Sequence, residues 1–516
     1  MLTFIKAFAI FLFKYKCLNS NIQLVFNYQS VNYCYTTIIN KNMVMYKHII
    51  ILLSLVVFST QTKKKVDDLF NGLYDKDIYS GYLETGNPNH QLFYIFTPSQ
   101  SDTPTTAPLI LWLHGGPGCS AIESLLIEMG PVVTDKFSGK FHVNEFSWNK
   151  EYNVLYLESP AGVGYTINTD EKKTYNEQIS STESVYALGK FFEEFPEYKD
   201  VDFYISGFSY SGINIPFFVK AFYEQSEYTV NLKGLFIGNG YTSYEGDMEN
   251  AMVHMGYGHG LISEELMREF ERNCPHLDFL YRNKPDVPEQ STTSNTIFPR
   301  KLVTKRCNEI RTEIRNCFEG VELYGMYRKC RKGATNDYTP ESLMYKLYEK
   351  QRSLLVVNEE EKKEETTIWP SFCNGDPFMS DFVNSETTKE KLGVDQSKQW
   401  IYCDFSIFDQ YDGEESYPLY KDVLLKHDIK IWHFSGDGDM CIPTIGTLYW
   451  MDKLGLNITT QWRQWHTHNQ VAGYLQEYDN KLAIITFIGA GHQVPSDRRE
   501  ESLKALNGLI KGELPQ

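Results

Sequence analysis

The chain has 516 residues, of which 42% are hydrophobic and 22% charged, and its formal net charge is -16 at pH 7. This length allows a large α/β fold with insertions, and the apolar content allows a sizeable buried core. The negative charge argues against a nucleic-acid partner, because phosphate binding needs a basic surface.

The first 62 residues have the character of a leader. An apolar run, residues 49–58, follows the basic stretch Met45-Tyr-Lys-His and precedes Ser59-Thr60. This is the layout of a secretory signal peptide, and it is short for a membrane span. We predict a signal peptide at 45–60, with translation starting at Met43 or Met45; a membrane-anchored precursor is the alternative. After signal removal we expect no membrane attachment, and a lysosomal, vacuolar or extracellular protein.

Apolar runs bounded by turn residues alternate with helix-like segments along the rest of the chain. Uninterrupted apolar runs are typical of strands buried on both faces, and alternation of strand with helix predicts a mostly parallel sheet covered by helices on both faces. The helix-like segments include residues 178–194 and 448–453. We predict strands at residues 81–83, 91–96, 109–113, 153–157, 202–205, 232–240, 429–434 and 482–488.

The middle of the chain differs, because strand signals vanish between residues 244 and 372. Charged helical stretches at 263–272 and 304–319 dominate there. Of the eight cysteines after the leader, five lie in or at the edge of this segment, and none has CxxC spacing. An even count behind an export signal predicts disulfides, and the lack of CxxC spacing disfavours a zinc site. We therefore predict a disulfide-stapled, helical insertion or lid at 244–372, between core segments 63–243 and 373–516.

A serine with the context of a nucleophile follows the strand predicted at 202–205. Ser209 lies in Gly207-Phe-Ser-Tyr-Ser-Gly212, ahead of a helix-compatible stretch. Small neighbours suit the tight strand-to-helix turn that exposes a catalytic hydroxyl. A serine hydroxyl still needs a base to accept its proton.

The partners follow two later strands in the order serine, acid, histidine. Gly436-Asp-Gly-Asp439 ends one strand, and Gly489-Ala-Gly-His492 ends another. His492 would be the general base, and Asp437 or Asp439 would orient its ring. The turn Gly115-Gly-Pro-Gly118 ends an earlier strand, and its amides, with that of Tyr210, could hold an oxyanion. His466 and His468 are interpreted as surface residues.

In total, the chain resembles the serine carboxypeptidase family of the α/β-hydrolase fold. The stretches that carry the resemblance run in family order from about residue 81 to 511. They are Trp112–Ser120, Glu128–Pro131, Phe146–Asn149, Glu158–Tyr165, the Ser209 turn, Gly238–Gly240, the Asp439 loop and Gly489–Pro495.

The resemblance implies release of C-terminal amino acids from peptides, by Ser209, Asp439 and His492, without metal or other cofactor. It selects Asp439 as the acid and assigns the oxyanion to the amides of Gly116 and Tyr210. It implies carboxylate binding by His114, Gly115 and Glu128, and disulfides Cys119–Cys403 and Cys330–Cys373. Family members are often dimers, so a homodimer is also an expectation. The sequon at Asn457 predicts glycosylation.

Two positions depart from the family pattern in the device that receives the substrate's terminal carboxylate. His114 stands where the family has Asn, and Phe208 stands where it has Glu. In the family that Glu pairs with the counterpart of Glu128, and two close carboxyls share a proton because both cannot ionise cheaply. We hypothesise that protonated His114, held by Glu128, replaces the lost carboxyl.

Two alternatives remain open. Weakened carboxylate recognition would give a carboxypeptidase-like acyltransferase or esterase, which uses the same triad. A non-catalytic binding protein would keep the fold without the activity, which the intact triad disfavours.

Overall fold

The computed structural model describes residues 63–134, 138–224, 229–243, 246–247, 249–274, 304–328, 377–408 and 415–512. All of these residues belong to one compact unit. The predicted signal peptide, Cys330 and Cys373 therefore lie outside the described residues. Within them, no helix combines the length and the apolar character that crossing a bilayer requires.

Within the described residues, this unit is built on one 12-stranded sheet. Its central strands, from β7 through β4, β9, β10 and β11 to β14, are parallel, and its outer pairings are antiparallel. β8 (Ile167–Asn168) pairs with β3 alone. In spatial order the others are β1 (Lys64–Lys65), β2 (Tyr79–Glu84), β3 (His90–Thr97), β7 (Asn153–Leu157), β4 (Leu109–Leu113), β9 (Asp202–Phe208), β10 (Asn231–Gly238), β11 (Lys430–Gly436), β14 (Leu482–Phe487), β13 (Gln470–Tyr478) and β12 (Ile458–Thr467).

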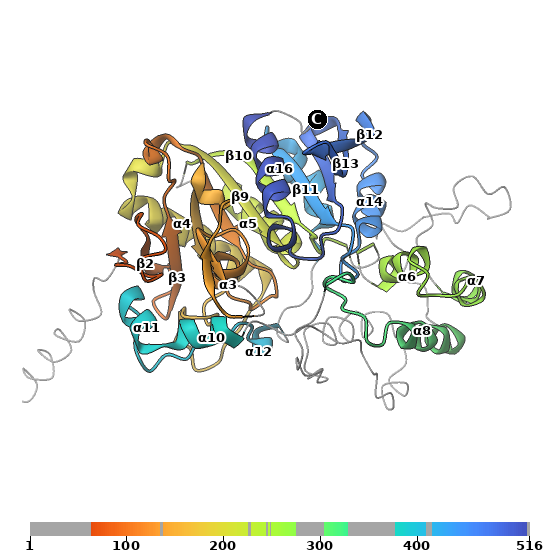
Figure 1. Cartoon of the computed structure of the whole chain (residues 1–516), viewed down its shortest axis with the longest axis horizontal. Helices are drawn as coiled ribbons and strands as arrows, with labels where there is room; N and C mark the ends of the chain where they lie inside the picture. The colour runs from red at the N-terminus through yellow and green to blue at the C-terminus, as the bar shows by residue number, and fades with distance from the viewer. Residues whose placement is uncertain are drawn as a thin grey trace, which may run out of the picture. The chain divides into compact units, whose positions relative to one another are not determined.

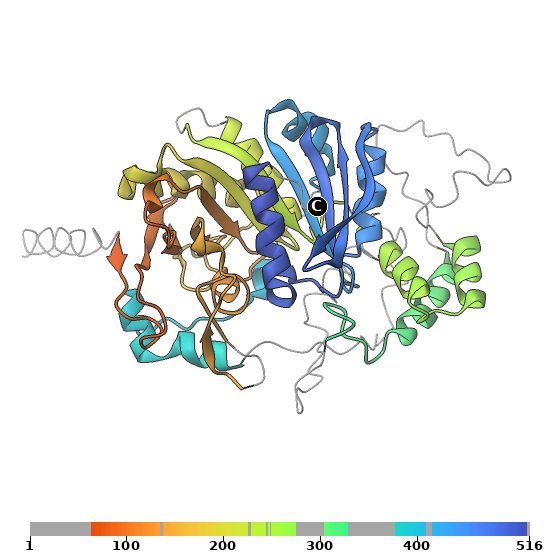
Figure 2. The same cartoon turned by 45° about the horizontal axis from the view of Figure 1, so that its top comes forward.

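Helices cover both faces of this sheet, as predicted. Successive side chains of a strand point to opposite faces, so the apolar side chains of β4 pack into two cores, one on each face of the sheet. Ile110 and Trp112 join the core beneath α3 (Ile122–Ile127) and α16 (Arg499–Lys511). Leu111 joins the opposite core, beneath α4 (Glu177–Glu194), α5 (Ser211–Glu224), α13 (Tyr417–Asp422) and α14 (Thr444–Lys453). Figure 2 shows α16 lying across the sheet.

Within the predicted insertion the described residues form helices and no strand. These are α6 (Glu249–Gly258), α7 (Glu264–Asn273) and α8 (Lys305–Cys317) (Figure 1). Ser263 and Thr304 cap α7 and α8, each accepting a backbone N–H of the first turn. A Cys274–Cys307 disulfide joins the end of α7 to the start of α8. The helices share a small core with the residues after Ser209, which includes Phe270 and Ile310.

Short elements complete the described chain. β5 (Val132–Thr134) and β6 (Phe141–Val143) form a separate ribbon. The further short α-helices after the insertion are α10 (Pro377–Asn384), α11 (Glu386–Leu392), α12 (Phe405–Phe408) and α15 (Val494–Asp497).

Candidate active site

Ser209 occupies a strained turn between β9 and α5. Its φ is +62°, in the left-handed region that side chains rarely adopt. The turn is held by hydrogen bonds from the Ser209 amide to Gly238 O (2.9 Å) and from the Tyr241 amide to Ser209 O (2.8 Å). Its neighbours have no room for side chains, because a Cβ on Gly207 would lie 2.2 Å from Leu113 O. The small residues therefore allow the turn that presents the serine.

The predicted acid and base meet beside this turn. His492 Nδ1 and Asp439 Oδ2 are 2.7 Å apart, and both side chains are buried. Asp439 also accepts hydrogen bonds from Asn239 Nδ2 (2.8 Å) and from the Cys441 amide (2.8 Å). A carboxylate so held fixes the imidazole tautomer and leaves Nε2 as the basic nitrogen. Among the described residues His492 Nε2 is buried without a hydrogen-bond partner, so this atom is the one available to accept a proton.

The Gly115–Gly118 turn lies against the nucleophile. A Cβ on Gly115 would lie 2.6 Å from Ser209 Cβ and 2.9 Å from the Tyr210 amide nitrogen. Gly116 has a φ of +123°, which favours glycine. Tyr210 is anchored from the other side, since its hydroxyl donates to Glu177 Oε1 at 2.6 Å. The amides of Gly116 and Tyr210, assigned to the oxyanion by resemblance, thus belong to two segments in direct contact.

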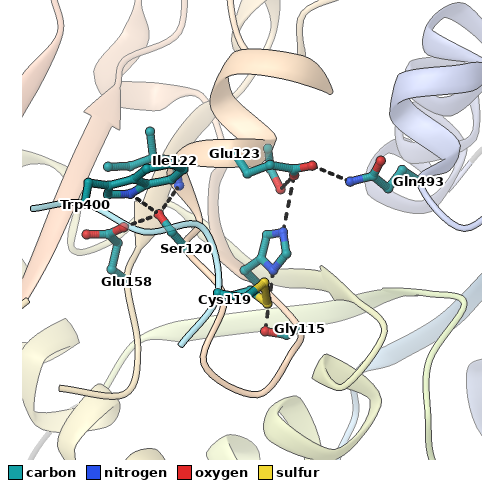
Figure 3. The surroundings of a disulfide bond; sticks show 11 residues. Gly115, Cys119, Ser120, Ile122, Glu123, Glu158, Trp400 and Gln493 are labelled. Atoms are coloured by element: carbon teal, nitrogen blue, oxygen red, sulfur yellow. Dashed lines mark hydrogen bonds and ion pairs between the residues drawn. A yellow bond between two sulfur atoms is a disulfide. The ribbon is translucent and has the colours of Figure 1, made fainter. Parts of the chain in front are cut away.

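His114 is buried beside the nucleophile and paired with an acid that sequence analysis did not single out. Its Nε2 lies 3.3 Å from Glu123 Oε2, and Glu123 Oε1 accepts a hydrogen bond from Gln493 Nε2 at 2.5 Å. Figure 3 shows Glu123 between the imidazole and the Gln493 amide. Gln493 directly follows His492. Glu123 therefore joins the turn after β4 to the His492 loop.

The hypothesis paired His114 with Glu128, and the structure adds Glu123 as an acid within hydrogen-bond distance of the ring. Glu128 ends α3 and accepts a hydrogen bond from Ser124 Oγ at 2.6 Å. It remains close, since one ligand atom from each of His114, Glu123 and Glu128 lies within 4.8 Å of the others. One signal in the sequence pointed to Glu123: it is the only charged residue of the otherwise apolar or small stretch 119–127.

Phe208 fills the place of the family's second carboxyl with an aromatic ring. Its centroid lies 4.7 Å from that of His114 and 5.4 Å from that of His492, both edge-on. The residue is buried and belongs to the core beneath α3. Phe208 thus forms an apolar wall between the two histidines.

A disulfide holds a second aromatic ring, that of Tyr402, against His114. Cys119 and Cys403 are bonded, 284 residues apart in sequence, and the flanking backbone adds hydrogen bonds from the Ser120 amide to Tyr402 O and from the Asp404 amide to Gly118 O. Tyr402 then lies edge-on to His114, with centroids 5.7 Å apart. The Cys119–Cys403 pairing implied by resemblance therefore fixes a wall of the site. Cys317 forms no disulfide with another described cysteine.

A buried carboxyl supports the same turn from behind. Glu158 accepts a short hydrogen bond from Ser120 Oγ and one from the Tyr165 amide at 2.8 Å. Trp400 Nε1 donates to the same Ser120 oxygen at 2.9 Å (Figure 3). Burial raises the pKa of Glu158 to about 7, although these hydrogen bonds act to lower it.

Because the pKa of Glu158 is raised, we expect the free energy of unfolding to be larger in acid than at neutral pH. The folded pKa exceeds the ordinary value of 4.5, so the contribution of Glu158 to the free energy of unfolding is complete below pH 4.5 and lost as pH rises through 7. The shift corresponds to about 3 kcal/mol at most. Asp247, whose pKa burial raises to about 8, acts in the same direction. Urea unfolding should therefore show a higher midpoint at pH 5 than at pH 7.5.

The matched variant is Glu158→Gln, which keeps the shape of the side chain and removes its titration. Its unfolding midpoint should depend less steeply on pH between 4.5 and 7. An unchanged slope would show that Glu158 does not carry the effect.

Two clusters within the described residues have the residue types of metal ligands, namely Asp439–Cys441–His492 and His114–Glu123–Glu128. In each, a histidine and a carboxylate are already hydrogen-bonded to one another. Burial raises the pKa of the Cys441 thiol well above its ordinary value, which disfavours the thiolate that a metal prefers.

Comparison with known proteins agrees with this geometry. The sequence model of the serine carboxypeptidase family matches residues 70–512. The chain belongs to this family. Serine carboxypeptidase-like 34 of Arabidopsis thaliana is 33% identical over 456 residues, covering 84% of this chain and 85% of the relative. Serine carboxypeptidase-like 26 of Oryza sativa subsp. japonica is 29% identical over 456 residues, covering 84% and 87%.

A solved structure shares the fold. The prohormone-processing carboxypeptidase KEX1(DELTA)P of Saccharomyces cerevisiae superposes with a TM-score of 0.65 at 21% identity, covering 87% of this chain and 95% of that one. The predicted α/β-hydrolase fold is thereby confirmed. Membership of the serine carboxypeptidase family supports a hydrolase.

Proposed function

We propose that the protein is a serine carboxypeptidase that releases C-terminal amino acids from peptides through an acyl-enzyme on Ser209. The observation that carries the proposal is the buried His492–Asp439 hydrogen bond of 2.7 Å beside a strained, glycine-flanked serine. A carboxypeptidase also needs a receptor for the terminal carboxylate. Our candidate for this receptor is the pair of His114 and Glu123. His114 directly precedes Gly115, the first residue of the turn proposed to hold the oxyanion.

The reaction follows from these positions. Ser209 Oγ attacks the scissile carbonyl carbon while its proton passes to His492 Nε2, and the amides of Gly116 and Tyr210 stabilise the oxyanion. His492 then protonates the leaving amine, which departs as the free amino acid. A water molecule attacks the acyl-enzyme and gives its proton to His492, which returns it to Ser209 Oγ as the acyl–oxygen bond breaks and the shortened peptide acid leaves. Asp439 stabilises the imidazolium in both steps.

Acidic conditions should favour carboxylate binding. One ligand atom from each of His114, Glu123 and Glu128 lies within 4.8 Å of the others, and two carboxyls at this range cannot both ionise cheaply. Both His114 nitrogens already face protein oxygens, Glu123 Oε2 and, at 3.5 Å, Gly115 O. We therefore assign His114 the positive charge of the receptor, and the backbone of Gly115 the direct contact with substrate.

An N-blocked dipeptide, with its C-terminus free or amidated, tests the proposal across pH 4–7. We expect strong preference for the free carboxylate, greatest in acid, and no hydrolysis by Ser209→Ala. The His114→Asn, Phe208→Glu double variant restores the family pattern and should move the pH dependence toward that of a carboxyl pair. Equal cleavage of the amide would refute carboxylate recognition, and an unchanged preference in the double variant would refute the role of these two positions.

The second candidate is acyl transfer to an alcohol, or ester hydrolysis. It is favoured by Phe208, whose ring borders His492 and leaves no titratable group at that position. Product analysis with an ester donor and an alcohol acceptor distinguishes it, since transfer gives a new ester where hydrolysis gives only the acid.

We also propose entry into the secretory pathway, and a glycan at Asn457. Asn457 is exposed immediately before β12, where its amide donates to Asp479 Oδ2 at 2.8 Å. A mobility shift on endoglycosidase treatment, abolished in Asn457→Gln, would support glycosylation. A homodimer remains a proposal, which sedimentation of the purified protein would test.

A further inference from the structure

The end of the described insertion contacts both catalytic loops through its backbone. Residues 322–328, here called the strap, follow α8. Leu323 O accepts hydrogen bonds from the amides of Met440 (2.8 Å) and Cys441 (3.2 Å), directly after the triad acid. Tyr324 O accepts the amide of His492 itself at 2.7 Å. The strap therefore joins the two loops that supply acid and base. In Figure 1 it is the green segment that leaves α8.

The contact at His492 is close enough to exclude a side chain. A Cβ on Gly491 would lie 2.2 Å from Tyr324 O. The Tyr324 ring lies edge-on to the imidazole, with centroids 4.8 Å apart. His492 is thus held between Phe208 on one side and the strap on another.

An ion pair holds the far end of the strap to the histidine loop. Arg328 Nε donates to both Asp497 oxygens (3.0 and 3.1 Å), and its terminal Nη2 donates to Oδ2 at 2.7 Å. Asp497 Oδ2 also accepts the amide of Gly491 at 2.8 Å. The two side chains are only 20% and 16% exposed, so solvent weakens this pair less than a surface pair. A guanidinium bound through two nitrogens also fixes direction, which an ammonium does not.

We propose that Arg328 is a positioning residue for catalysis, acting through Asp497 and the Gly491 amide on His492. The inference rests on the proposed use of His492 as the base of Ser209. A small displacement of the imidazole from the serine oxygen is costly, since misplacement by about 1 Å can lower the rate about 100-fold. The insertion would then contribute to the chemistry of the site as well as covering it.

The test uses the mature full-length protein and the variants Arg328→Met, Arg328→Lys and Asp497→Asn. The matched control is Arg306→Met, which removes an insertion arginine whose ion pairs with Glu269 and Glu309 are half exposed. Active sites are counted by titration with a fluorophosphonate, so that rates refer to folded molecules. We measure kcat and KM on the N-blocked dipeptide, and the second-order rate of phosphonylation of Ser209.

We expect Arg328→Met and Asp497→Asn to lower kcat about 10- to 100-fold with KM little changed, and to slow phosphonylation by a similar factor. Arg328→Lys should keep more of the rate than Arg328→Met does. The control Arg306→Met should keep the kcat of the parent protein. An unchanged kcat per titrated site in the Arg328 and Asp497 variants would overturn the inference. If the dipeptide is not a substrate, the proposed function fails, but phosphonylation still reports on the positioning of His492.

Discussion

Replacing Asp439 by asparagine is expected to lower kcat about 10,000-fold without unfolding the protein. Asp439 Oδ2 accepts from His492 Nδ1 and Asn239 Nδ2, and Oδ1 accepts the Cys441 amide. An amide at this position must direct its NH2 group toward one of these donors. Directed at His492, it favours the tautomer that carries its proton on Nε2, which cannot accept the proton of Ser209.

The neighbouring aspartate provides the control. Asp437 lies in the same loop, but its Oδ1 accepts the amide of Gly489 at 2.6 Å. Asp437→Asn should therefore keep kcat within a few-fold of the parent enzyme. Steady-state kinetics of the two variants, with melting temperatures for both, decides the assignment, and a larger loss in Asp437→Asn would reverse it.

Adding one methyl group at Gly115 should cost about 100- to 1,000-fold in kcat, the range for losing an oxyanion donor. The new Cβ would lie 2.6 Å from Ser209 Cβ, 2.7 Å from Phe208 O and 2.9 Å from the Tyr210 amide nitrogen. Two of these atoms are backbone, so relief requires the turn to move away from the nucleophile. The Gly116 amide would move with it.

Gly258→Ala is the matched control, because its Cβ would meet no atom within 4 Å. This variant should behave as the parent protein in kcat and KM. Phosphonylation rates separate the causes for Gly115→Ala, since a damaged oxyanion site slows the reaction of Ser209 with the probe as well. A Gly115→Ala protein with parental kcat would exclude an oxyanion site in this turn.

The strands at the centre of the sheet could be predicted from the sequence because burial on both faces leaves an uninterrupted apolar run. The predictions at 109–113 and 153–157 coincide with β4 and β7. The hairpin of β12 and β13 was missed for the opposite reason. β12 is an edge strand in which only Trp465 and Thr467 are fully buried, so neither a continuous apolar run nor a regular alternation marks it.

The candidate site also has a part that could be predicted from the sequence and a part that could not. The loops that carry Ser209, Asp439 and His492 could be predicted as a candidate site because each follows a strand, and the carboxyl ends of parallel strands lie at one edge of a sheet. The Glu123–His114 and Arg328–Asp497 contacts depend on how a helix and a strap lie over that edge. Arg328 and Asp497 are 169 residues apart, and nothing local in either segment indicates the other.

The order of the strands also determines when the protein becomes active during its synthesis. β9, which presents the nucleophile, is translated early, whereas β14, which presents the base, comes last and must enter the sheet between β11 and β13. The insertion, whose strap anchors the histidine loop, is made in the interval between β10 and β11. A nascent chain therefore carries Ser209 without His492 through most of translation. The proposed triad is therefore complete only after β14 has entered the sheet.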